Sequence, residues 1–235
     1  MSARMPIAYA QWELRDAARG PGLIILAIAV LAGFIMTRLP AAQTFTTEGA
    51  VRAIANQSLF PLVLVVTAGM VSRDLNEGYY RAYFSRPVSP SLFYLQRWLV
   101  GGAVLLLFIP LLAGAASIRT GELAVPVWIV GRAALLYLLL GGTVLLLSTV
   151  TRRDWVVAAV LYIMEQILHS VQAGGGRLGA VARAIYTILP PYHVAAIDGT
   201  PTPGEIWTAS ACGAGLVLAA LAVLHWRALG SGGRA

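Results

Sequence analysis

Residues 99–118 read LVGGAVLLLFIPLLAGAASI, twenty residues in a row without a charged side chain. A helix rises about 1.5 Å per residue, so a run of this length crosses the roughly 30 Å hydrocarbon core of a bilayer. Backbone polar groups find no water in lipid and must bond within the segment, so such a run forms an α-helix. The stretch therefore predicts an all-α integral membrane protein.

Apolar windows of similar length occur on both sides of this stretch. The six expected spans, in chain order, are residues 22–39, 54–71, 99–118, 125–149, 155–173 and 206–226. We assign them to one transmembrane domain that covers residues 1–235. The chain has 58% hydrophobic and 11% charged residues, whereas about 25% of the residues of a typical soluble domain are charged.

The distribution of arginine predicts the orientation of the spans, because cytoplasmic loops carry an excess of positive charge. All 17 basic residues are arginine. If the N-terminus is cytoplasmic, eleven arginines fall on the inside, five fall on the outside, and Arg132 lies within span four. We therefore expect both termini in the cytoplasm. Since the net charge of +7 is explained by these loops, we expect the lipid bilayer, and no nucleic acid, as a partner.

Residues 72–98 (SRDLNEGYYRAYFSRPVSPSLFYLQRW), directly before the opening stretch, carry charges of both signs between two spans. Asp74 stands where a helix N-cap belongs, and Glu77 follows at the position of a capping-box acid. Pro87 is expected to end this short helix, because the residue before a proline avoids the helical region. The Ser-Pro pair at 89–90 predicts the start of the next helix. Two interpretations remain open: an interfacial loop whose arginines reach the lipid headgroups, and a docking helix for a cytoplasmic partner.

The same segment resembles the cytoplasmic loop of ABC-2 type transporter permeases, in which an acidic segment that ends in glycine precedes an RPVS turn. The residues that carry the resemblance are Arg73, Asp74, Glu77, Gly78, Ser85, Arg86, Pro87, Val88 and Ser89. The chain departs from the pattern at Tyr79, where the family often has a small hydroxyl residue. The amphipathic stretch 6–20 looks like the elbow helix of the family, and LPPYHVAAIDG (189–199) is similar to its proline-containing segment before the last span.

This resemblance implies six transmembrane helices, an N-terminal elbow helix, and a cytoplasmic coupling helix between spans two and three. It also implies an exporter in the prokaryotic cytoplasmic (inner) membrane, in which two permease copies or paralogues join a separate ATP-binding cassette subunit. The coupling residues implied are Arg73, Asp74, Glu77, Gly78, Tyr79, Arg81, Arg86 and Pro87. The chain contains no G-x-x-x-x-G-K-[ST] phosphate loop, so we expect it to be no enzyme and to hold no cofactor, with ATP and Mg bound by the partner.

Ionisable residues inside a membrane span are functional candidates. Glu165 lies ten residues into span five, about 15 Å along the helix and near the midplane. His169 follows one turn later and Gln172 lies beyond it on the same face. The three residues predict a polar site that lines a substrate path or relays a proton. A structural contact between helices and an early end of span five remain alternatives. Arg132 is expected to reach the membrane surface or to pair with an acid such as Glu165.

Two other functions fit the sequence. One is an ion-driven secondary transporter or channel that uses Glu165 and His169. The other is a membrane assembly or immunity factor of the same fold that does not transport. The sequence names no substrate. Residues 174–203 predict an outer segment, either a re-entrant helical pair, as the resemblance implies, or an amphipathic surface helix. The single cysteine, Cys212, excludes an intrachain disulfide, and we expect no metal site.

Overall fold

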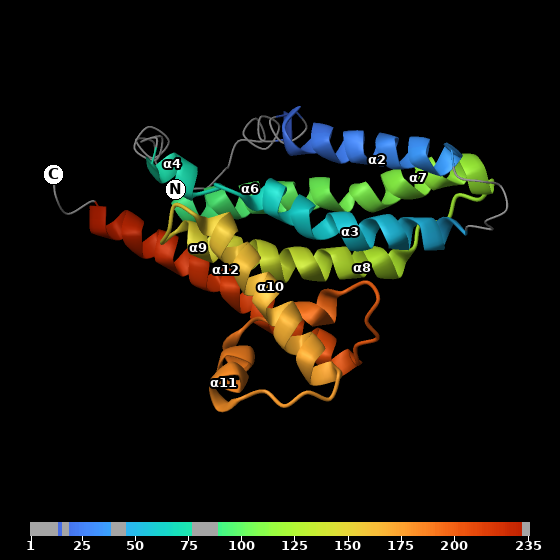
Figure 1. The fold of residues 1–235 in the computed structure, drawn as a ribbon. Helices are drawn as coiled ribbons and strands as arrows, with labels where there is room; N and C mark the ends of the chain where they lie inside the picture. The colour runs from blue at the N-terminus through green and yellow to red at the C-terminus, as the bar shows by residue number, and fades with distance from the viewer. Residues whose placement is uncertain (1–13, 16–18, 39–45, 77–88, 232–235) are drawn as a thin grey trace.

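The computed structural model describes residues 14–15, 19–38, 46–76 and 89–231, and all regular elements in these ranges are helices (Figure 1). In chain order they are α2 (Pro21–Arg38), α3 (Thr47–Thr67), α4 (Ser72–Asn76), α6 (Pro90–Leu106), α7 (Phe108–Thr120), α8 (Val127–Leu136), η1 (Tyr137–Gly141), α9 (Gly142–Ser148), α10 (Asp154–Ala173), α11 (Ala180–Ile188), η2 (Tyr192–Ala195) and α12 (Pro203–Ser231). The expected all-α fold is thereby confirmed.

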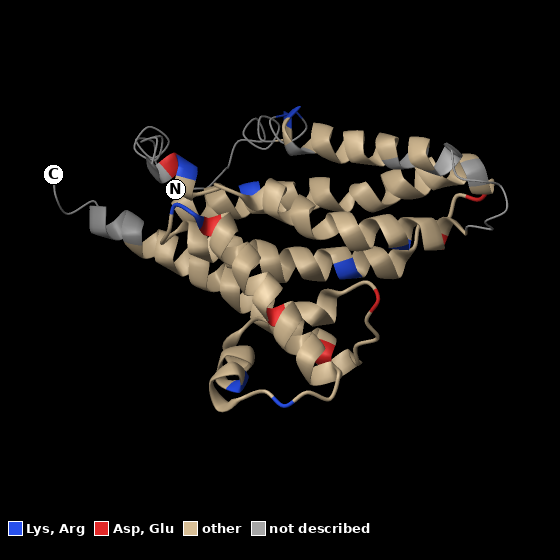
Figure 2. Cartoon of the chain, in the orientation of Figure 1, with Lys and Arg blue, Asp and Glu red and all other residues tan. Residues whose placement is uncertain are grey.

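In the described part of the chain, five helical segments are long and apolar enough to cross a membrane, which makes the chain a multi-pass membrane protein. They are Thr47–Asp74, Pro90–Ile118, Val127–Ser148, Asp154–Ala173 and Pro203–Trp226. Helix α2 occupies the range expected for span one, but its apolar stretch Gly22–Leu31 is shorter. The count of six spans therefore stays a prediction. In Figure 2 most charged residues lie near the ends of the helices and around α11, and a basic patch on α8 and an acidic patch on α10 interrupt the uncharged helix surface between them.

Two helices begin earlier than the hydrophobic windows predict, because polar caps extend them. Helix α3 begins at Thr47, and the Thr46 hydroxyl accepts a hydrogen bond of 3.0 Å from the backbone N–H of Gly49. Helix α12 begins at Pro203 after a capping box, in which Glu205 accepts from the backbone N–H of Thr202 and the Thr202 hydroxyl accepts from that of Glu205. Both caps place polar turns at the membrane boundary, where a search for apolar windows stops short.

The cap predicted at Asp74 is wrong, whereas the cap predicted at Ser89 is confirmed. Helix α4 begins at Ser72, so Asp74 lies inside it, and its carboxylate is buried against α6. Ser89 has the extended backbone of an N-cap, with Pro90 as the first residue of α6. The expected elbow helix at 6–20 and most of the coupling loop fall largely outside the described residues.

Helices α6 and α8 approach closely because glycine leaves room for an aromatic ring. A Cβ atom on Gly102 would lie 2.7 Å from Tyr137, which belongs to the π-helical turn η1. The Tyr137 hydroxyl donates a hydrogen bond of 2.5 Å to the backbone carbonyl of Trp98. Gly213 on α12 gives similar access to Leu138, whereas nothing lies within 4 Å of a Cβ on Gly215. Glycine thus allows close helix packing at Gly102 and Gly213 but not at Gly215.

The segment 174–203 contains one α-helix and one 3-10 turn, where a pair of helices was one of the two expectations. Helix α11 has no buried residue and lies beside α10 (Figure 1). The turn η2 is different, since Tyr192, Val194 and Ala195 are buried against the bundle. The segment therefore has two parts: α11, which is not buried, and η2, which is packed against the bundle.

Candidate functional site

Two polar sites stand out, one at each end of the helices. We call the first the clasp; it consists of Gly69, Ser72, Asp74, Tyr94, Arg97 and Asp154 and lies where the 72–98 segment joins the bundle. We call the second the polar cluster; it consists of Glu165, Gln166, His169, Tyr186 and His193 and lies between α10, α11 and the loop at η2.

The clasp holds the two ends of the 72–98 segment together. Asp74 on α4 is only 4% exposed. Its carboxylate accepts hydrogen bonds from the Tyr94 hydroxyl at 3.2 Å and from Arg97 at 3.0 Å, both on α6. Arg97 also donates to the backbone carbonyl of Met70. Charge-assisted hydrogen bonds of this kind are stronger than neutral ones, so α4 and α6 are joined by an ion pair whose carboxylate is buried and whose arginine is partly exposed.

A second carboxylate ties the same corner to α10. Asp154, the first residue of α10, is 1% exposed. It accepts hydrogen bonds of 3.2 Å from the backbone N–H of Gly69 and from the Ser72 hydroxyl. Gly69 has a positive φ of 69°, a conformation that costs glycine little and other residues more. The chain thus turns from α3 into α4 at Gly69, whose backbone N–H is bonded to Asp154.

Only part of the predicted coupling set can be placed. Arg73 is exposed and Asp74 is buried in the clasp. The remaining members lie outside the described residues: Glu77, Gly78, Tyr79, Arg81, Arg86 and Pro87. Sequence reasoning missed Asp154, Tyr94 and Arg97; the spacing of Tyr94 and Arg97, one turn apart on the same helix face, was the available signal.

The polar cluster is built around a fully buried carboxylate. Glu165 has 0% exposure. Its Oε1 lies 2.5 Å from His193 Nδ1, and its Oε2 accepts a hydrogen bond of 3.0 Å from the Gln166 side chain. The rings of His193 and His169 stack with centroids 4.0 Å apart and planes 9° apart. Glu165 and His169 are therefore brought together as predicted, with His193 as an additional member.

Tyr186 closes the cluster from α11. Its hydroxyl lies 3.0 Å from His169 Nδ1. Burial first, and then the negative charges of Glu165 and Glu205, raise the pKa of Tyr186 above its usual value. The hydroxyl therefore stays protonated at neutral pH, and which group donates in its hydrogen bond with His169 Nδ1 depends on the tautomer of the histidine. The cluster thus consists of two polar pairs, Glu165 with His193 and His169 with Tyr186, which meet through the stacked rings of the two histidines.

The expected place of Gln172 in the site, and one of the two alternatives for Arg132, are not met. Gln172 is exposed, and within the described part of the chain it makes no hydrogen bond to the cluster. Arg132 does not pair with Glu165; it donates to the backbone carbonyls of Val194 at 2.5 Å and Gly199 at 3.3 Å. His193 lies 28 residues beyond Glu165 in an irregular loop, so no helical periodicity could connect the two.

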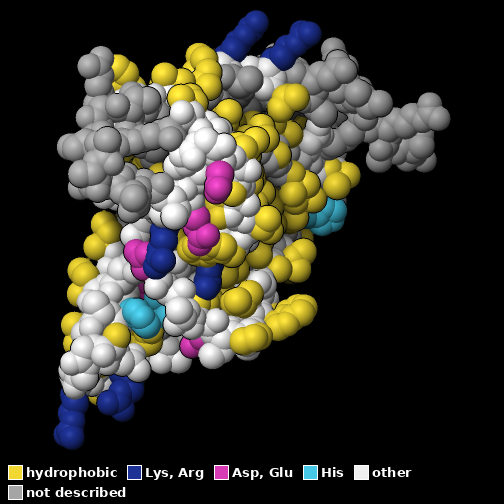
Figure 3. Space-filling model, turned by 90° about the vertical axis from the view of Figure 1, so that its right-hand side faces the viewer, with side chains coloured by type: hydrophobic (Ala, Val, Ile, Leu, Met, Phe, Trp, Pro, Cys, Tyr) yellow, Lys and Arg dark blue, Asp and Glu magenta, His cyan; other side chains and the backbone are white. Residues whose placement is uncertain are grey.

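The loop from η2 to Gly199 has further anchors at this end of the molecule. Asp198 accepts hydrogen bonds from Arg52 at 2.8 Å and from Asn56 at 2.6 Å, both on α3. Arg52 also lies over the ring of Trp128, 5.8 Å from its centroid. Figure 3 shows acidic and basic side chains side by side on this face. The loop is thus bonded to both α3 and α8.

Among the described residues, no group of three or more His, Cys, Asp or Glu side chains is placed to hold a metal ion. Compared with known proteins, the sequence matches no family model and no curated protein. Function is therefore argued from the two sites and from the resemblance of the 72–98 segment.

Proposed function

We propose that this chain is the permease subunit of an ABC-2 type exporter. In this proposal six spans form the translocation path in the prokaryotic inner membrane, and both termini are cytoplasmic. A separate ATP-binding cassette subunit binds ATP and Mg and docks on the 72–98 segment. A second copy of the chain, or a paralogue, completes the path.

The clasp is the observation that carries this proposal. A coupling segment can transmit force only if both of its ends are fixed to the helices that must move. Asp74 fixes α4 to α6 through Tyr94 and Arg97, and Asp154 fixes the same corner to α10. Buried ion pairs of this kind are costly to break on one side. A displacement of the segment between α4 and α6 would therefore be passed to three candidate spans at once.

The test separates docking from transmission. The tagged chain, purified from its native membranes, is expected to carry an ATP-binding subunit. A Glu77→Arg/Arg86→Glu variant should lose that subunit, because both charges lie in the proposed docking surface. Asp74→Asn should keep the subunit but uncouple ATP hydrolysis from transport, because it weakens the clasp alone. If no ATPase accompanies the native chain, the exporter proposal fails.

Exposed apolar side chains on α10 support the proposal of a second copy. Val160, Ile163 and Ile167 are 56%, 50% and 56% exposed, on a helix whose opposite side holds Glu165. A single cysteine at Ile167, in a Cys212→Ser background, is expected to cross-link two copies in native membranes. A cysteine at Val181 on α11, which is 75% exposed, serves as the control. Equal cross-linking at both positions would contradict a specific contact.

The polar cluster favours a second candidate function, an ion-driven transporter. The support for it is a fully buried Glu165 paired with His193, next to the stacked ring of His169, because ionisable groups inside a membrane span are functional candidates. Liposomes that contain this chain alone are expected to show no proton flux under the exporter proposal. Flux that Glu165→Gln abolishes would favour the ion-driven function. Co-purification of an ATPase whose activity no substrate stimulates would instead favour a membrane assembly or immunity factor.

A further inference from the structure

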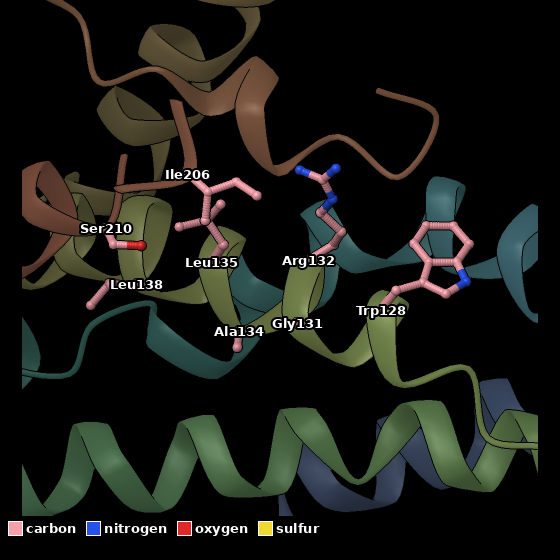
Figure 4. A pocket seen from close by; sticks show the side chains of 8 residues that line it. All are labelled: Trp128, Gly131, Arg132, Ala134, Leu135, Leu138, Ile206 and Ser210. Atoms are coloured by element: carbon pink, nitrogen blue, oxygen red, sulfur yellow. The ribbon is translucent and has the colours of Figure 1, made fainter. Parts of the chain in front are cut away.

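A groove runs between α8 and α12, two helices that each belong to a candidate span. Its volume is about 460 Å³, within the range of sites that hold small molecules. Gly131, Arg132 and Leu135 line it from α8, Leu138 from η1, and Ile206 and Ser210 from α12. In Figure 4 these side chains surround one open space, and the guanidinium of Arg132 extends away from the α8 ribbon.

The lining is apolar along the helices and cationic at one end. Leu135, Leu138 and Ile206 offer aliphatic surface, and Ile206 is 40% exposed. Both helices are candidate membrane spans, so lipid would reach the exposed part of this surface, at Ile206. A fatty acyl chain fits such a surface, since it would cover apolar side chains without losing hydrogen bonds.

A purely apolar ligand in this groove would leave the positive charge of Arg132 without a counter-charge. A guanidinium has five N–H donors, and the two bonds of Arg132 go to the neutral carbonyls of Val194 and Gly199. Within the described part of the chain, no carboxylate pairs with it. Arg52 and Arg97 differ, because they hold Asp198 and Asp74. A cation beside lipid is stabilised by an anionic partner, and the remaining N–H groups match the oxygens of a phosphate.

The depth of Arg132 agrees with a headgroup. It lies five residues after Val127, the first residue of α8, so about 7.5 Å from the end of the helix. Trp128, which also lines the groove, lies one turn nearer that end and is of the residue type enriched at membrane interfaces. The charged end of the groove therefore lies near the boundary between headgroups and hydrocarbon.

We propose that the groove between α8 and α12 binds one phospholipid with an anionic headgroup. The phosphate lies at Arg132, and one acyl chain follows Leu135, Leu138 and Ile206. The bound phosphate also sits beside the loop that Arg132 holds at Val194 and Gly199. This proposal goes beyond the exporter proposal and does not rest on it, since the groove is formed by one chain and needs no ATPase.

The test is native mass spectrometry of the full-length chain in detergent with equal amounts of phosphatidylglycerol and phosphatidylcholine. The native chain is expected to retain one phosphatidylglycerol in preference to phosphatidylcholine. Arg132→Gln should lower that retention about tenfold, the usual worth of a charge-assisted hydrogen bond. Gly131→Leu should block the groove sterically; its Cβ meets no other atom within 4 Å, so the fold is preserved.

Two controls match these variants. Gly215→Leu adds the same side chain at another exposed glycine with open space around it, and Arg183→Gln removes an exposed arginine on α11. Both should retain phosphatidylglycerol like the native chain. If Arg132→Gln does not fold, the lipid retention of Gly131→Leu alone tests the proposal.

Three results would overturn the proposal. The first is equal retention of both lipids by the native chain. The second is unchanged binding in Gly131→Leu, because a headgroup held only by surface charge does not need the groove. The third is displacement of the lipid by inorganic phosphate alone, which would make Arg132 a site for free anions.

Discussion

Two neighbouring membrane segments of this chain are held in place in different ways. Of the apolar window in Val127–Ser148, 67% is buried inside the chain, against 11% of that in Asp154–Ala173. Both are candidate spans of similar composition. The first is enclosed by other helices and packed at glycines, whereas the second is attached at a few polar points and exposes apolar residues around them.

This difference shows which parts of the molecule are suited to move. A segment enclosed by close packing changes position only if its neighbours do, because packed interiors deform little. Helix α10 has instead a buried carboxylate at its first residue, Asp154, and another at Glu165. Breaking those polar bonds would release it without disturbing the packed helices. Substitutions are therefore expected to lower the stability most at the polar bonds that attach α10 and at the tightest contacts of the packed helices.

Asp154→Ala is expected to be the most destabilising change. It leaves the buried N–H of Gly69 and the Ser72 hydroxyl without their acceptor, which costs about 3 kcal/mol in total. For a chain of this size that lowers the apparent Tm by about 6–12 °C. Thermal unfolding in detergent measures the effect, with the exposed neighbour Arg153→Ala as control. A shift no larger than that of the control would mean that α10 does not depend on its polar attachment.

Gly102→Val tests the packed side of the comparison. Its side chain would overlap Tyr137, since even a Cβ lies only 2.7 Å from that ring. Overpacking of this kind costs about 2 kcal/mol, or about 4–8 °C in apparent Tm. Gly215→Val carries the same change of helix propensity at an open position and should leave Tm almost unchanged. Similar shifts for the two variants would remove the distinction between an enclosed and an exposed region.

The sequence predicts the closely packed helices better than the polar bonds that attach α10, for physical reasons. Apolar windows locate the helices because lipid forces every backbone polar group to bond within its own segment. The start at Pro90 follows from Ser89 and proline chemistry alone. Asp154 and His193 could not be placed in the same way, because their partners lie 82 and 28 residues away. Gln172 was placed with Glu165 by periodicity, but α10 turns that residue outward where no loop covers it.

Glu165→Gln tests the second attachment of α10. Glutamine keeps an oxygen that accepts from His193 but loses the charge, so the expected cost is about 1 kcal/mol. Amide hydrogen exchange in residues 190–199 should become about fivefold faster, because that loop opens locally at lower cost. Gln172→Leu, an exposed residue two turns further along α10, should leave the exchange unchanged. If both variants act alike, the loop is held elsewhere and the polar cluster is not an attachment point.

The exposed pair of Arg52 and Asp198 should contribute least. Their side chains are 47% and 56% exposed, and ion pairs so accessible to solvent are worth less than about 1 kcal/mol. A double-mutant cycle with Arg52→Gln and Asp198→Asn, read by the same hydrogen exchange, gives the coupling between them. Salt should reduce that coupling, because screening acts on exposed charges, while leaving the buried bond of Asp154 to Ser72 unaffected. A coupling that exceeds the effect of Glu165→Gln and persists in high salt would reverse the order, and would place the main attachment of the loop on α3 instead of α10.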